Sequence, residues 1–359
     1  MITIALVVGA RPNFVKMSAV IAAIQQYPDL RFRLIHTGQH YDRNMSDTFF
    51  KDLEIPEPDV NLNVGSDSAA VQTAEIMFRL APVLGAEKPD LVLVVGDVNS
   101  TLAGAVVAAK MGIRLAHVEA GLRSFDRGMP EEINRILTDS VADLLFTSEP
   151  SANENLRREG VAEHRIHYVG NVMIDTLFRF RERSAASPIV ETLGLGPRGF
   201  ALLTLHRPAN VDGDGTLSAA LRALESVGRD VPVVFPVHPR TRQQLQRALA
   251  RTPAPWLRLV EPLPYLDFVQ LMATAAVVLT DSGGVQEETT ALGVPCLTLR
   301  PSTERPVTVT DGTNRLMGVD GEGIRSAWQQ IRQGDWPRGR LPELWDGKAA
   351  DRIVRILQG

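Results

Sequence analysis

The stretch AAVVLTDSGGVQEETTAL, residues 275–292, joins an apolar run to a segment with helix-forming character. Val277–Thr280 shows no alternation of apolar and polar residues, which is typical of a strand buried on both faces of a sheet. Ser282, Gly283 and Gly284 then open a helix, whose first backbone N–H groups have no partner within the helix. A buried strand that leads at once into a helix indicates an α/β fold with a parallel sheet.

Two glutamates in this stretch need an explanation, because an open helix N-terminus favours an anion. Glu287 is explained by the favourable interaction of an acid with the helix dipole. Glu288 lies four residues after Gly284, on the same face of the helix, and its carboxylate can only accept hydrogen bonds. A ribose diol would donate them. The stretch therefore predicts a binding site for a nucleoside diphosphate, with the phosphates on the N–H groups and the ribose on Glu288. The alternative is that these residues only cap the helix.

The same alternation of apolar runs and helical patterns recurs along the 359 residues. The predicted strands are Ile2–Val8, Phe32–His36, Leu91–Val95, Leu115–Val118, Leu144–Thr147, His167–Val169, Ala201–Leu205, Val233–Val237, Leu257–Val260, Val277–Thr280 and Cys296–Leu299. A break near residues 170–195 predicts two doubly wound domains that face a cleft. We expect the domains at residues 1–172 and 173–340, and a C-terminal helix in residues 341–359 that packs back on the first domain.

The composition narrows the class of protein. Hydrophobic residues make up 44% and charged residues 22% of the chain, as in soluble globular proteins. The net charge of −4 argues against nucleic acid as a partner. No apolar run approaches a membrane span, and the N-terminus lacks the features of a signal peptide. The single cysteine, Cys296, excludes an internal disulfide and favours a cytoplasmic location.

Polar side chains follow most of the predicted strands, at the edge where ligands bind in parallel sheets. In the first half these are carboxylates, Asp97, Glu119, Glu131 and Glu132, with basic residues among the same loops. In the second half they are His206, His238 and the stretch from Ser282 to Glu288. Acids opposite a nucleotide-binding stretch favour proton abstraction over phosphoryl transfer, because the latter needs a magnesium site.

Each of these residues also has a purely structural interpretation. Glu132 and Arg135 have the spacing of a helical ion pair. Arg305 could be a solvated charge in a loop, and His206 could be a histidine of the hydrophobic core. His36 and His40 flank a Thr-Gly pair that disfavours a shared metal ion. The sequence contains neither a G-x-G-x-x-G fingerprint after the first strand nor a P-loop. We therefore expect no metal and no cofactor.

A set of motifs adds a family resemblance. In chain order they are Gly9-Ala10-Arg11-Pro12 with Lys16, Thr37-Gly38-Gln39-His40, Gly96-Asp97, His117-Val118-Glu119-Ala120-Gly121-Leu122-Arg123, Pro130-Glu131-Glu132 with Asn134-Arg135, Thr204-Leu205-His206-Arg207, Asp281-Ser282-Gly283-Gly284-Val285-Gln286-Glu287-Glu288 and Thr303-Glu304-Arg305-Pro306. With these motifs the chain resembles the non-hydrolysing UDP-N-acetylglucosamine 2-epimerases. The resemblance implies two Rossmann-like domains in the glycosyltransferase-B arrangement, and a homodimer.

The resemblance also implies an activity, the interconversion of UDP-N-acetylglucosamine and UDP-N-acetylmannosamine for bacterial surface polysaccharides. UDP is eliminated across C1–C2 and adds back to a 2-acetamidoglucal. The implied acid/base residues are Asp97, Glu119, Glu131 and His206. The implied substrate-binding residues are Arg11, Lys16, Gln39, His40, Arg135, His238, Phe268, Ser282, Gly283, Gly284, Glu288 and Arg305. Which carboxylate removes the C2 proton stays open.

Alternative functions share this architecture. They are a 2-epimerase for a UDP-2,3-diacetamido uronic acid, a hydrolysing epimerase, a glycosyltransferase and a nucleotide-sugar sensor. Some members of the family need a second UDP-N-acetylglucosamine as an activator, and carry an arginine directly after the Gln-His pair. Here Tyr41 and Asp42 follow His40. Since an acid would oppose a diphosphate, we expect no such activator.

Overall fold

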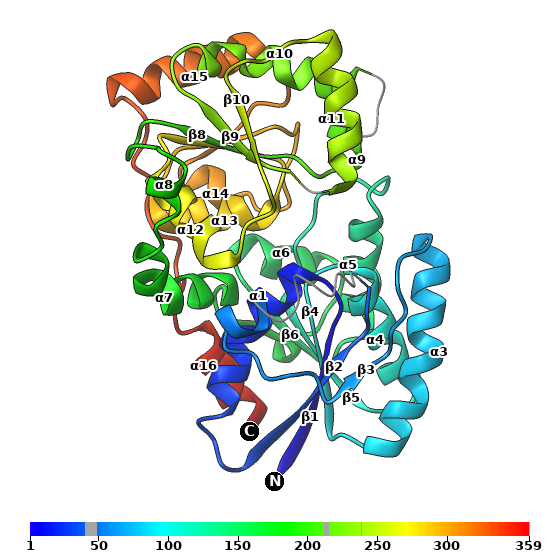
Figure 1. Ribbon diagram of the computed structural model, residues 1–359. Coiled ribbons are helices and arrows are strands. Elements are labelled where there is room, and N and C mark those ends of the chain that lie inside the picture. Colours follow the sequence, from blue (N-terminus) through cyan, green and yellow to red (C-terminus); the bar gives the residue numbers. More distant parts are fainter. Residues whose placement is uncertain (40–48, 212–214, 238, 359) are drawn as a thin grey trace. The chain divides into compact units, whose positions relative to one another are not determined.

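The computed structural model describes residues 1–39, 49–211, 215–237 and 239–358. The chain forms two compact units, unit 1 with Met1–Arg179 and Glu343–Gly359, and unit 2 with Phe180–Pro342 (Figure 1). The first division lies within helix α7 (Val172–Ala185), whereas the sequence placed it at residue 172, at the start of this helix. His40 and His238, and the Tyr41-Asp42 pair, lie outside the described residues.

Unit 1 is an α/β domain around one sheet. Its elements are β1 (Ile2–Val8), α1 (Arg11–Ile24), β2 (Leu30–His36), β3 (Val60–Asn61), α3 (Ala69–Glu87), β4 (Leu91–Val95), α4 (Asn99–Lys110), β5 (Arg114–Ala120), α5 (Pro130–Val141), β6 (Leu144–Thr147), α6 (Pro150–Arg158), a 3₁₀ turn (Glu163–Arg165), β7 (Ile166–Tyr168), α7 and α16 (Ala349–Gln358). Among the described residues the strand order is β3-β2-β1-β4-β5-β6-β7, with parallel pairing.

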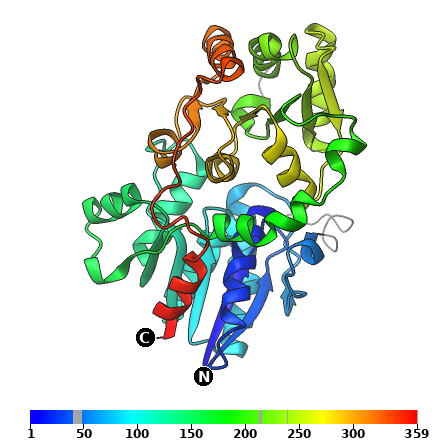
Figure 2. The same cartoon turned by 90° about the vertical axis from the view of Figure 1, so that its left-hand side faces the viewer.

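The C-terminal segment belongs to unit 1. Helix α16 packs against α1, and the two helices lie side by side in Figure 2. The Asp175 carboxylate on α7 accepts a hydrogen bond of 2.7 Å from the N–H of Ala350, in the first turn of α16. The Trp345 indole, which is fully buried, donates to the Ser148 carbonyl at 2.8 Å. These contacts hold residues 343–358 against the domain formed by the first half of the chain.

Unit 2 repeats the same architecture. Its elements are α8 (Ile189–Thr192), β8 (Ala201–Thr204), α9 (Pro208–Val211), α10 (Thr216–Gly228), β9 (Val233–Pro236), α11 (Pro239–Arg251), β10 (Leu257–Val260), α12 (Tyr265–Thr274), β11 (Val277–Thr280), α13 (Gly283–Leu292), β12 (Cys296–Thr298), α14 (Val307–Thr310), β13 (Asn314–Leu316) and α15 (Gly321–Gln333). Within the described residues its strand order is β10-β9-β8-β11-β12-β13, again parallel.

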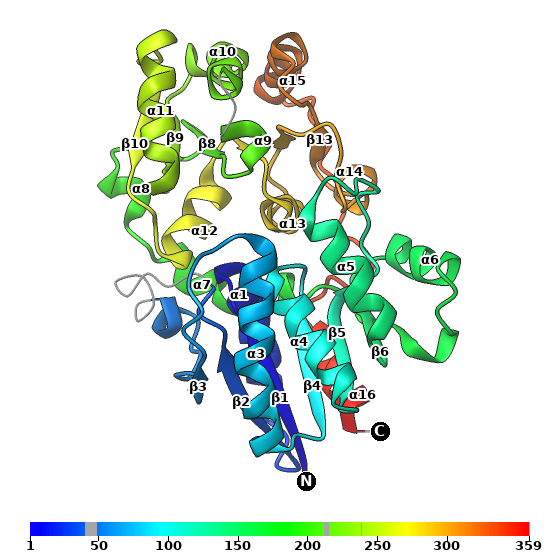
Figure 3. The ribbon, with the colours of Figure 1, turned by 90° about the vertical axis from the view of Figure 1, so that its right-hand side faces the viewer.

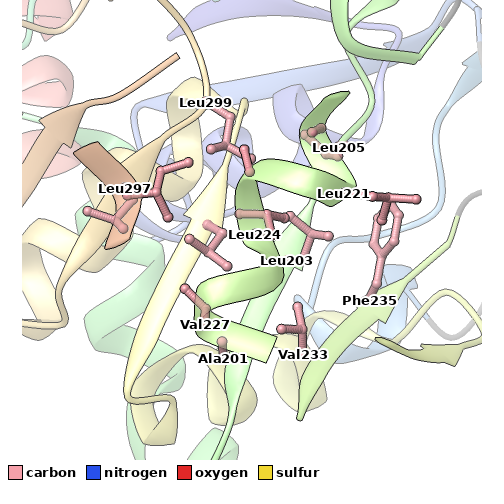
Figure 4. Close-up of a cluster of buried hydrophobic side chains, with 14 of the residues drawn as sticks. Ala201, Leu203, Leu205, Leu221, Leu224, Val227, Val233, Phe235, Leu297 and Leu299 are labelled. Atoms are coloured by element: carbon pink, nitrogen blue, oxygen red, sulfur yellow. The ribbon is translucent and has the colours of Figure 1, made fainter. Parts of the chain in front are cut away.

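The core of unit 2 shows why its strands lack alternation. Leu221, Leu224 and Val227 of α10 pack over apolar side chains of the sheet, among them Leu203 and Phe235 (Figure 4). Because helices cover parallel sheets on both faces, both sets of strand side chains must be apolar. The predicted fold class, two parallel-sheet α/β domains, is confirmed. The sequence missed β3 and β13, which are short and contain asparagine.

Both strand orders reverse direction once, between β1 and β4 in unit 1 and between β8 and β11 in unit 2. At such a switch point the loops of neighbouring strands run to opposite sides of the sheet and leave room for a ligand beyond the carboxyl ends. In unit 1 the segments at this position are Gly9–Asn13 and Gly96–Asn99. In unit 2 they are Leu205–Arg207 and Asp281–Gly284.

Within the described part of the chain, no helix is long and apolar enough to cross a membrane.

Candidate active site

Glu119 lies at an irregularity in β5, beside the switch point of unit 1. The register between β5 and β6 shifts between Val118 and Ala120, and Glu119 has a φ of 73°, in the left-handed region. A bulged residue in this conformation is strained unless it is glycine, and bulges re-aim side chains at functional sites. Glu119 is 7% exposed, and its carboxylate forms an ion pair with Lys16 of α1. The bulge thus places the buried carboxylate of Glu119 against the buried ammonium group of Lys16.

The turn after β1 brings Lys16 to this position. Asn13, one turn earlier on α1, accepts from the N–H of Ala10 at 3.2 Å and donates to the Val95 carbonyl at 2.7 Å. These bonds tie the start of α1 to the end of β4. The next residue, Gly96, has a φ of 72°, and a Cβ there would lie 3.3 Å from Glu119 Oε2 and 3.4 Å from Lys16 Nζ. Glycine therefore lets the backbone pass directly beside the ion pair.

Asp97 is held by helix α5. Its carboxylate pairs with Arg135, and its carbonyl accepts from the Asn134 side chain at 2.9 Å. Arg135 also binds Glu132 at 2.6 Å, so the helical pair that the sequence offered as a structural interpretation is present. Burial alone would raise the pKa of Glu132, but the N–H of Ser124 and the guanidinium of Arg135 lower it. Glu132 is thus an ionised support for Arg135, and Arg135 in turn orients Asp97.

Other candidates in unit 1 lie on neighbouring elements. Glu131, in the first turn of α5, is partly exposed. Arg11, at the start of α1, lies over the Phe49 ring at 5.0 Å, and burial lowers its pKa. Gln39 accepts from the Ser100 hydroxyl at 2.7 Å at the start of α4. The candidates of unit 1 thus all lie at or just beyond the carboxyl edge of one sheet; they are Asp97, Glu119, Glu131, Arg11, Lys16, Gln39 and Arg135.

His206 and Asp281 face each other at the switch point of unit 2. The His206 Nδ1 lies 2.9 Å from Oδ1 of Asp281, and the His206 side chain is 57% exposed, so the interpretation as a core histidine is wrong. Asp281 is fully buried. Burial alone would raise its pKa, but the hydrogen bonds and charge of His206, with the Asn210 amide and the N–H of Arg207, lower it to about 2. A buried carboxylate that orients an exposed imidazole is suited to acid/base chemistry.

Helix α13 begins at Gly283, and the Ser282 side chain does not cap it. A Cβ on Gly283 would lie 2.3 Å from Nη1 of Arg305, so glycine here lets the guanidinium reach the helix start. Arg305 is 4% exposed, which makes the interpretation as a solvated loop charge wrong. Its guanidinium pairs with Glu287 at 2.7 Å and with Glu304 at 2.5 Å. Glu287 is fully buried. It is therefore a partner of Arg305 and more than a complement of the helix dipole.

A cluster of arginines surrounds Glu304. Its carboxylate lies 2.8 Å from Arg300 and 3.3 Å from Arg207, besides its contact with Arg305. Burial alone would raise the pKa of Glu304, but these three cations hold it well below its ordinary value. Nη1 of Arg300 is buried and has no hydrogen-bond partner within the described residues. The cluster concentrates N–H donors beside the start of α13.

Glu288 and Phe268 lie on the two neighbouring helices α13 and α12. The Tyr265 hydroxyl donates to Oε1 of Glu288 at 2.9 Å, and burial, together with the Glu288 carboxylate, raises the pKa of Tyr265. Glu288 is 5% exposed and Phe268 is half-buried, while Ser282 and Gly284 are partly exposed at the start of α13. Unit 2 therefore brings His206, Ser282, Gly283, Gly284, Glu288 and Arg305 to one region beyond the carboxyl ends of β8, β11 and β12.

The sequence assigned no role to several supporting residues, although Asp281 and Glu304 lie within its motifs. They are Asp139, Tyr265, Asp281 and Glu304, each of which contacts a candidate residue or its neighbour. Asp139 is four residues after Arg135 and seven after Glu132, so the helical period of α5 could have revealed it. Tyr265 and Asp281 depend on contacts between segments distant in the chain, whereas Glu304 is next to Arg305 and four residues after Arg300. No group of three potential metal-binding side chains occurs among the residues with described positions.

Comparisons with known proteins agree with this architecture. A sequence profile of the family described as UDP-N-acetylglucosamine 2-epimerase matches residues 22–358. The UDP-N-acetylglucosamine 2-epimerase of Methanocaldococcus jannaschii is 40% identical over 366 residues, which cover 99% of this chain and 98% of that protein. The UDP-2,3-diacetamido-2,3-dideoxy-D-glucuronate 2-epimerase of Pseudomonas aeruginosa is 44% identical over 356 residues, 98% of each chain.

Solved structures show the same fold. The M. jannaschii UDP-N-acetylglucosamine 2-epimerase in complex with UDP-N-acetylglucosamine and UDP has a TM-score of 0.90 with this chain, at 40% identity and 99% coverage of each chain. The Neisseria meningitidis UDP-N-acetylglucosamine 2-epimerase bound to UDP-N-acetylglucosamine also has a TM-score of 0.90, at 32% identity and 99% coverage of each chain. The fold is thus of the glycosyltransferase-B type, and the chain belongs to the UDP-N-acetylglucosamine 2-epimerase family of isomerases.

Proposed function

We propose that the protein is a cofactor-independent, non-hydrolysing 2-epimerase that converts UDP-N-acetylglucosamine to UDP-N-acetylmannosamine. The observation that carries this proposal is the environment of Glu119, a strained and buried acid that pairs with Lys16 at the carboxyl edge of the unit 1 sheet. Strain and buried charge at a ligand-binding edge favour a catalytic role over a structural one. The substrate follows from the relatives, which include enzymes named for UDP-N-acetylglucosamine.

The proposed reaction is an elimination followed by a re-addition. A carboxylate removes the proton at C2 of the sugar, the bond between C1 and the UDP oxygen breaks, and 2-acetamidoglucal and UDP result. UDP then adds back to C1 while C2 receives a proton on the opposite face. Asp97, Glu119 and Glu131 are the proposed acid/base groups at the sugar. His206, oriented by Asp281, is the proposed proton donor to the departing UDP.

The proposed substrate contacts follow from charge and position. The N–H groups at Ser282, Gly283 and Gly284, with Arg305, bind the diphosphate, because an open helix N-terminus and arginine both favour phosphate. Glu288 accepts from the ribose. The remaining proposed contacts to the nucleotide-sugar come from Arg11, Lys16, Gln39, His40, Arg135, His238 and Phe268.

A second substrate has a specific observation in its favour. The P. aeruginosa epimerase named for UDP-2,3-diacetamido-2,3-dideoxy-D-glucuronate is 44% identical to this chain, against 40% for the M. jannaschii enzyme. Both reactions invert C2 of a UDP-linked 2-acetamido sugar. The second candidate function is therefore the same inversion on a diacetamido uronic acid.

One experiment separates these functions. The purified protein is incubated with each UDP-sugar, without added cofactor or metal, and the products are followed by NMR. Formation of UDP-N-acetylmannosamine supports the first proposal. Turnover of the diacetamido uronate alone supports the second. Release of free N-acetylmannosamine with UDP would identify a hydrolysing epimerase, and conversion of neither substrate would contradict both proposals.

We also propose that the protein acts as a homodimer. Helices α3, α4 and α5 of unit 1 pack side by side (Figure 3). Val71 and Phe78 on α3 are 47% and 79% exposed, and Leu137 and Val141 on α5 are 44% and 38% exposed. Exposed apolar side chains on the two helices that flank α4 favour an interface on this face of unit 1. Sedimentation should give a dimer mass for the wild type and a monomer mass for Phe78→Glu; a monomeric wild type would contradict the proposal.

We propose that the protein works in the cytoplasm. We also propose that the synthesis of surface polysaccharides consumes the UDP-sugar that it forms. The single cysteine, Cys296, is buried, and burial raises the pKa of its thiol to about 12. An inert thiol and no possible internal disulfide suit a reducing compartment.

A further inference from the structure

His117 is a fully buried histidine that the proposed reaction does not use. It lies on β5, two residues before Glu119, and its side chain is 0% exposed. Its Nε2 lies 2.8 Å from the Gly96 carbonyl oxygen, and its Nδ1 lies 2.6 Å from Oδ1 of Asp139 on α5. Both ring nitrogens therefore have partners, one in the turn after β4 and the other on α5.

The partners determine where the ring hydrogens are. The Gly96 carbonyl can only accept, so Nε2 carries a hydrogen. Oδ2 of Asp139 already accepts from Nη1 of Arg123 at 2.7 Å and from the N–H of Gly121 at 3.0 Å. Because Asp139 already accepts from these two N–H donors, it is an ionised acceptor, and Nδ1 of His117 carries a hydrogen as well.

The charges around His117 are balanced. Arg123 pairs on its other side with Glu159 at 2.7 Å, so the four groups His117, Asp139, Arg123 and Glu159 alternate in sign. His117 and Asp139 are both inaccessible to water. A fully partnered buried network holds its members in one arrangement. A doubly protonated His117 is therefore compatible with its burial.

We propose that His117 is a positioning residue that clamps the turn carrying Asp97 against β5. The N–H of Gly96 donates to the Val118 carbonyl at 3.0 Å, and the Gly96 carbonyl accepts from His117. Both backbone groups of Gly96 are thus held by β5, the strand that carries Glu119. The clamp sets the separation between the two acids, because Asp97 follows Gly96 directly.

His117 also contacts helix α5, which carries the third acid. Asp139 lies on the helix that also carries Arg135, the partner of the Asp97 carboxylate, and Glu131 in its first turn. The bond from His117 to Asp139 adds to the bonds that Asp139 makes with Gly121 and Arg123, and these two still hold the helix to the end of β5 when His117 is replaced. The inference rests on the proposed function, in which Asp97, Glu119 and Glu131 share the proton transfers at C2.

A matched pair of substitutions separates the two bonds of His117. In His117→Gln the side-chain amide nitrogen takes about the position of Nε2 and keeps the donor to Gly96. In His117→Asn the amide nitrogen takes about the position of Nδ1, so the donor to Gly96 is lost. We expect His117→Asn to lower kcat by about 10- to 100-fold, the effect of misplaced reacting groups. KM and the Kd for UDP should stay unchanged, and His117→Gln should recover most of kcat.

Two results would overturn the clamp: a full kcat in His117→Asn, or an equal loss of kcat in both variants. Circular dichroism checks that each variant is folded. A second measurement needs no variant activity. In wild-type protein with ¹⁵N-labelled histidine, both ring nitrogens of His117 should show bound hydrogens, and a bare Nε2 would refute the bond to the Gly96 carbonyl and with it the clamp. Wild-type protein that does not convert UDP-N-acetylglucosamine would refute the proposed function, while this NMR signature would still decide the clamp.

Discussion

Replacing Asp281 by asparagine removes the charge that orients His206 and preserves the size of the side chain. Oδ1 of Asp281 faces Nδ1 of His206, and Oδ2 accepts from the N–H of Arg207 at 2.9 Å and from the Asn210 amide at 3.0 Å. Asparagine has one acceptor oxygen, so its amide group must face either Asn210 or His206. Either orientation leaves His206 without an anion to stabilise its protonated form.

The magnitude follows from the buried position of Asp281. Loss of the carboxylate that supports an acid/base histidine should lower kcat by about 10²–10⁴. For stability, the pKa of Asp281 falls from 3.8 to about 2 on folding. At 1.36 kcal/mol per unit this contributes about 2 kcal/mol to the free energy of unfolding. Because the folded pKa is the lower one, this contribution is present above pH 3.8 and is lost as the pH falls toward 2.

The assay combines kinetics with denaturation. We expect Asp281→Asn to lose about 2 kcal/mol at pH 7, measured by urea unfolding, and to depend less on pH between about 4 and about 2 than the wild type. If Asp281 acts through His206, the double variant with His206→Asn should be no slower than His206→Asn alone. An unchanged kcat in Asp281→Asn, or additive losses in the double variant, would refute the reasoning.

The remaining predictions concern the acids and the activator. Glu119→Gln should lower kcat by about 10²–10⁴ and leave UDP affinity almost unchanged in calorimetry; a normal kcat would exclude a role in proton transfer. Glu288→Ala should weaken UDP binding by about 1–3 kcal/mol, whereas Glu287→Ala should chiefly lower the melting temperature, because Arg305 loses a buried partner. Equal effects on UDP affinity would mean that the ribose contact is assigned to the wrong glutamate. The reverse reaction, measured with UDP-N-acetylmannosamine alone, should start without a lag. A lag abolished by trace UDP-N-acetylglucosamine would show that an activator is required.

The fold was predictable because parallel sheets leave a direct record in the sequence. Runs such as Leu91–Val95 and Val277–Thr280 are apolar throughout, since helices cover both faces of the sheet, and the structure has strands at these same residues. Strands β3 and β13 escaped prediction, because a two- or three-residue strand that contains asparagine carries no apolar run. Strand order was also beyond the sequence, since it depends on contacts between distant segments.

The candidate site was predictable in its residue types and less so in its contacts. Acids and histidines at strand ends marked Asp97, Glu119 and His206, because the carboxyl ends of parallel strands share one edge. The left-handed conformation of Glu119 could not be predicted, since the predicted strand ends at Val118 and the structure continues β5 to Ala120 through an irregularity at Glu119. Glu287 was interpreted through the helix dipole, because its partner Arg305 is 18 residues away in the chain.

The most direct test of the central claim, proton abstraction at C2 without oxidation of the sugar, is turnover in deuterium oxide. The protein is incubated with UDP-N-acetylglucosamine and no added cofactor, and the C2 position of the UDP-sugars is followed by NMR. The account predicts that the UDP-N-acetylmannosamine formed carries solvent deuterium at C2. Product that retains the original hydrogen at C2 throughout, or turnover that depends strictly on added NAD, would contradict it.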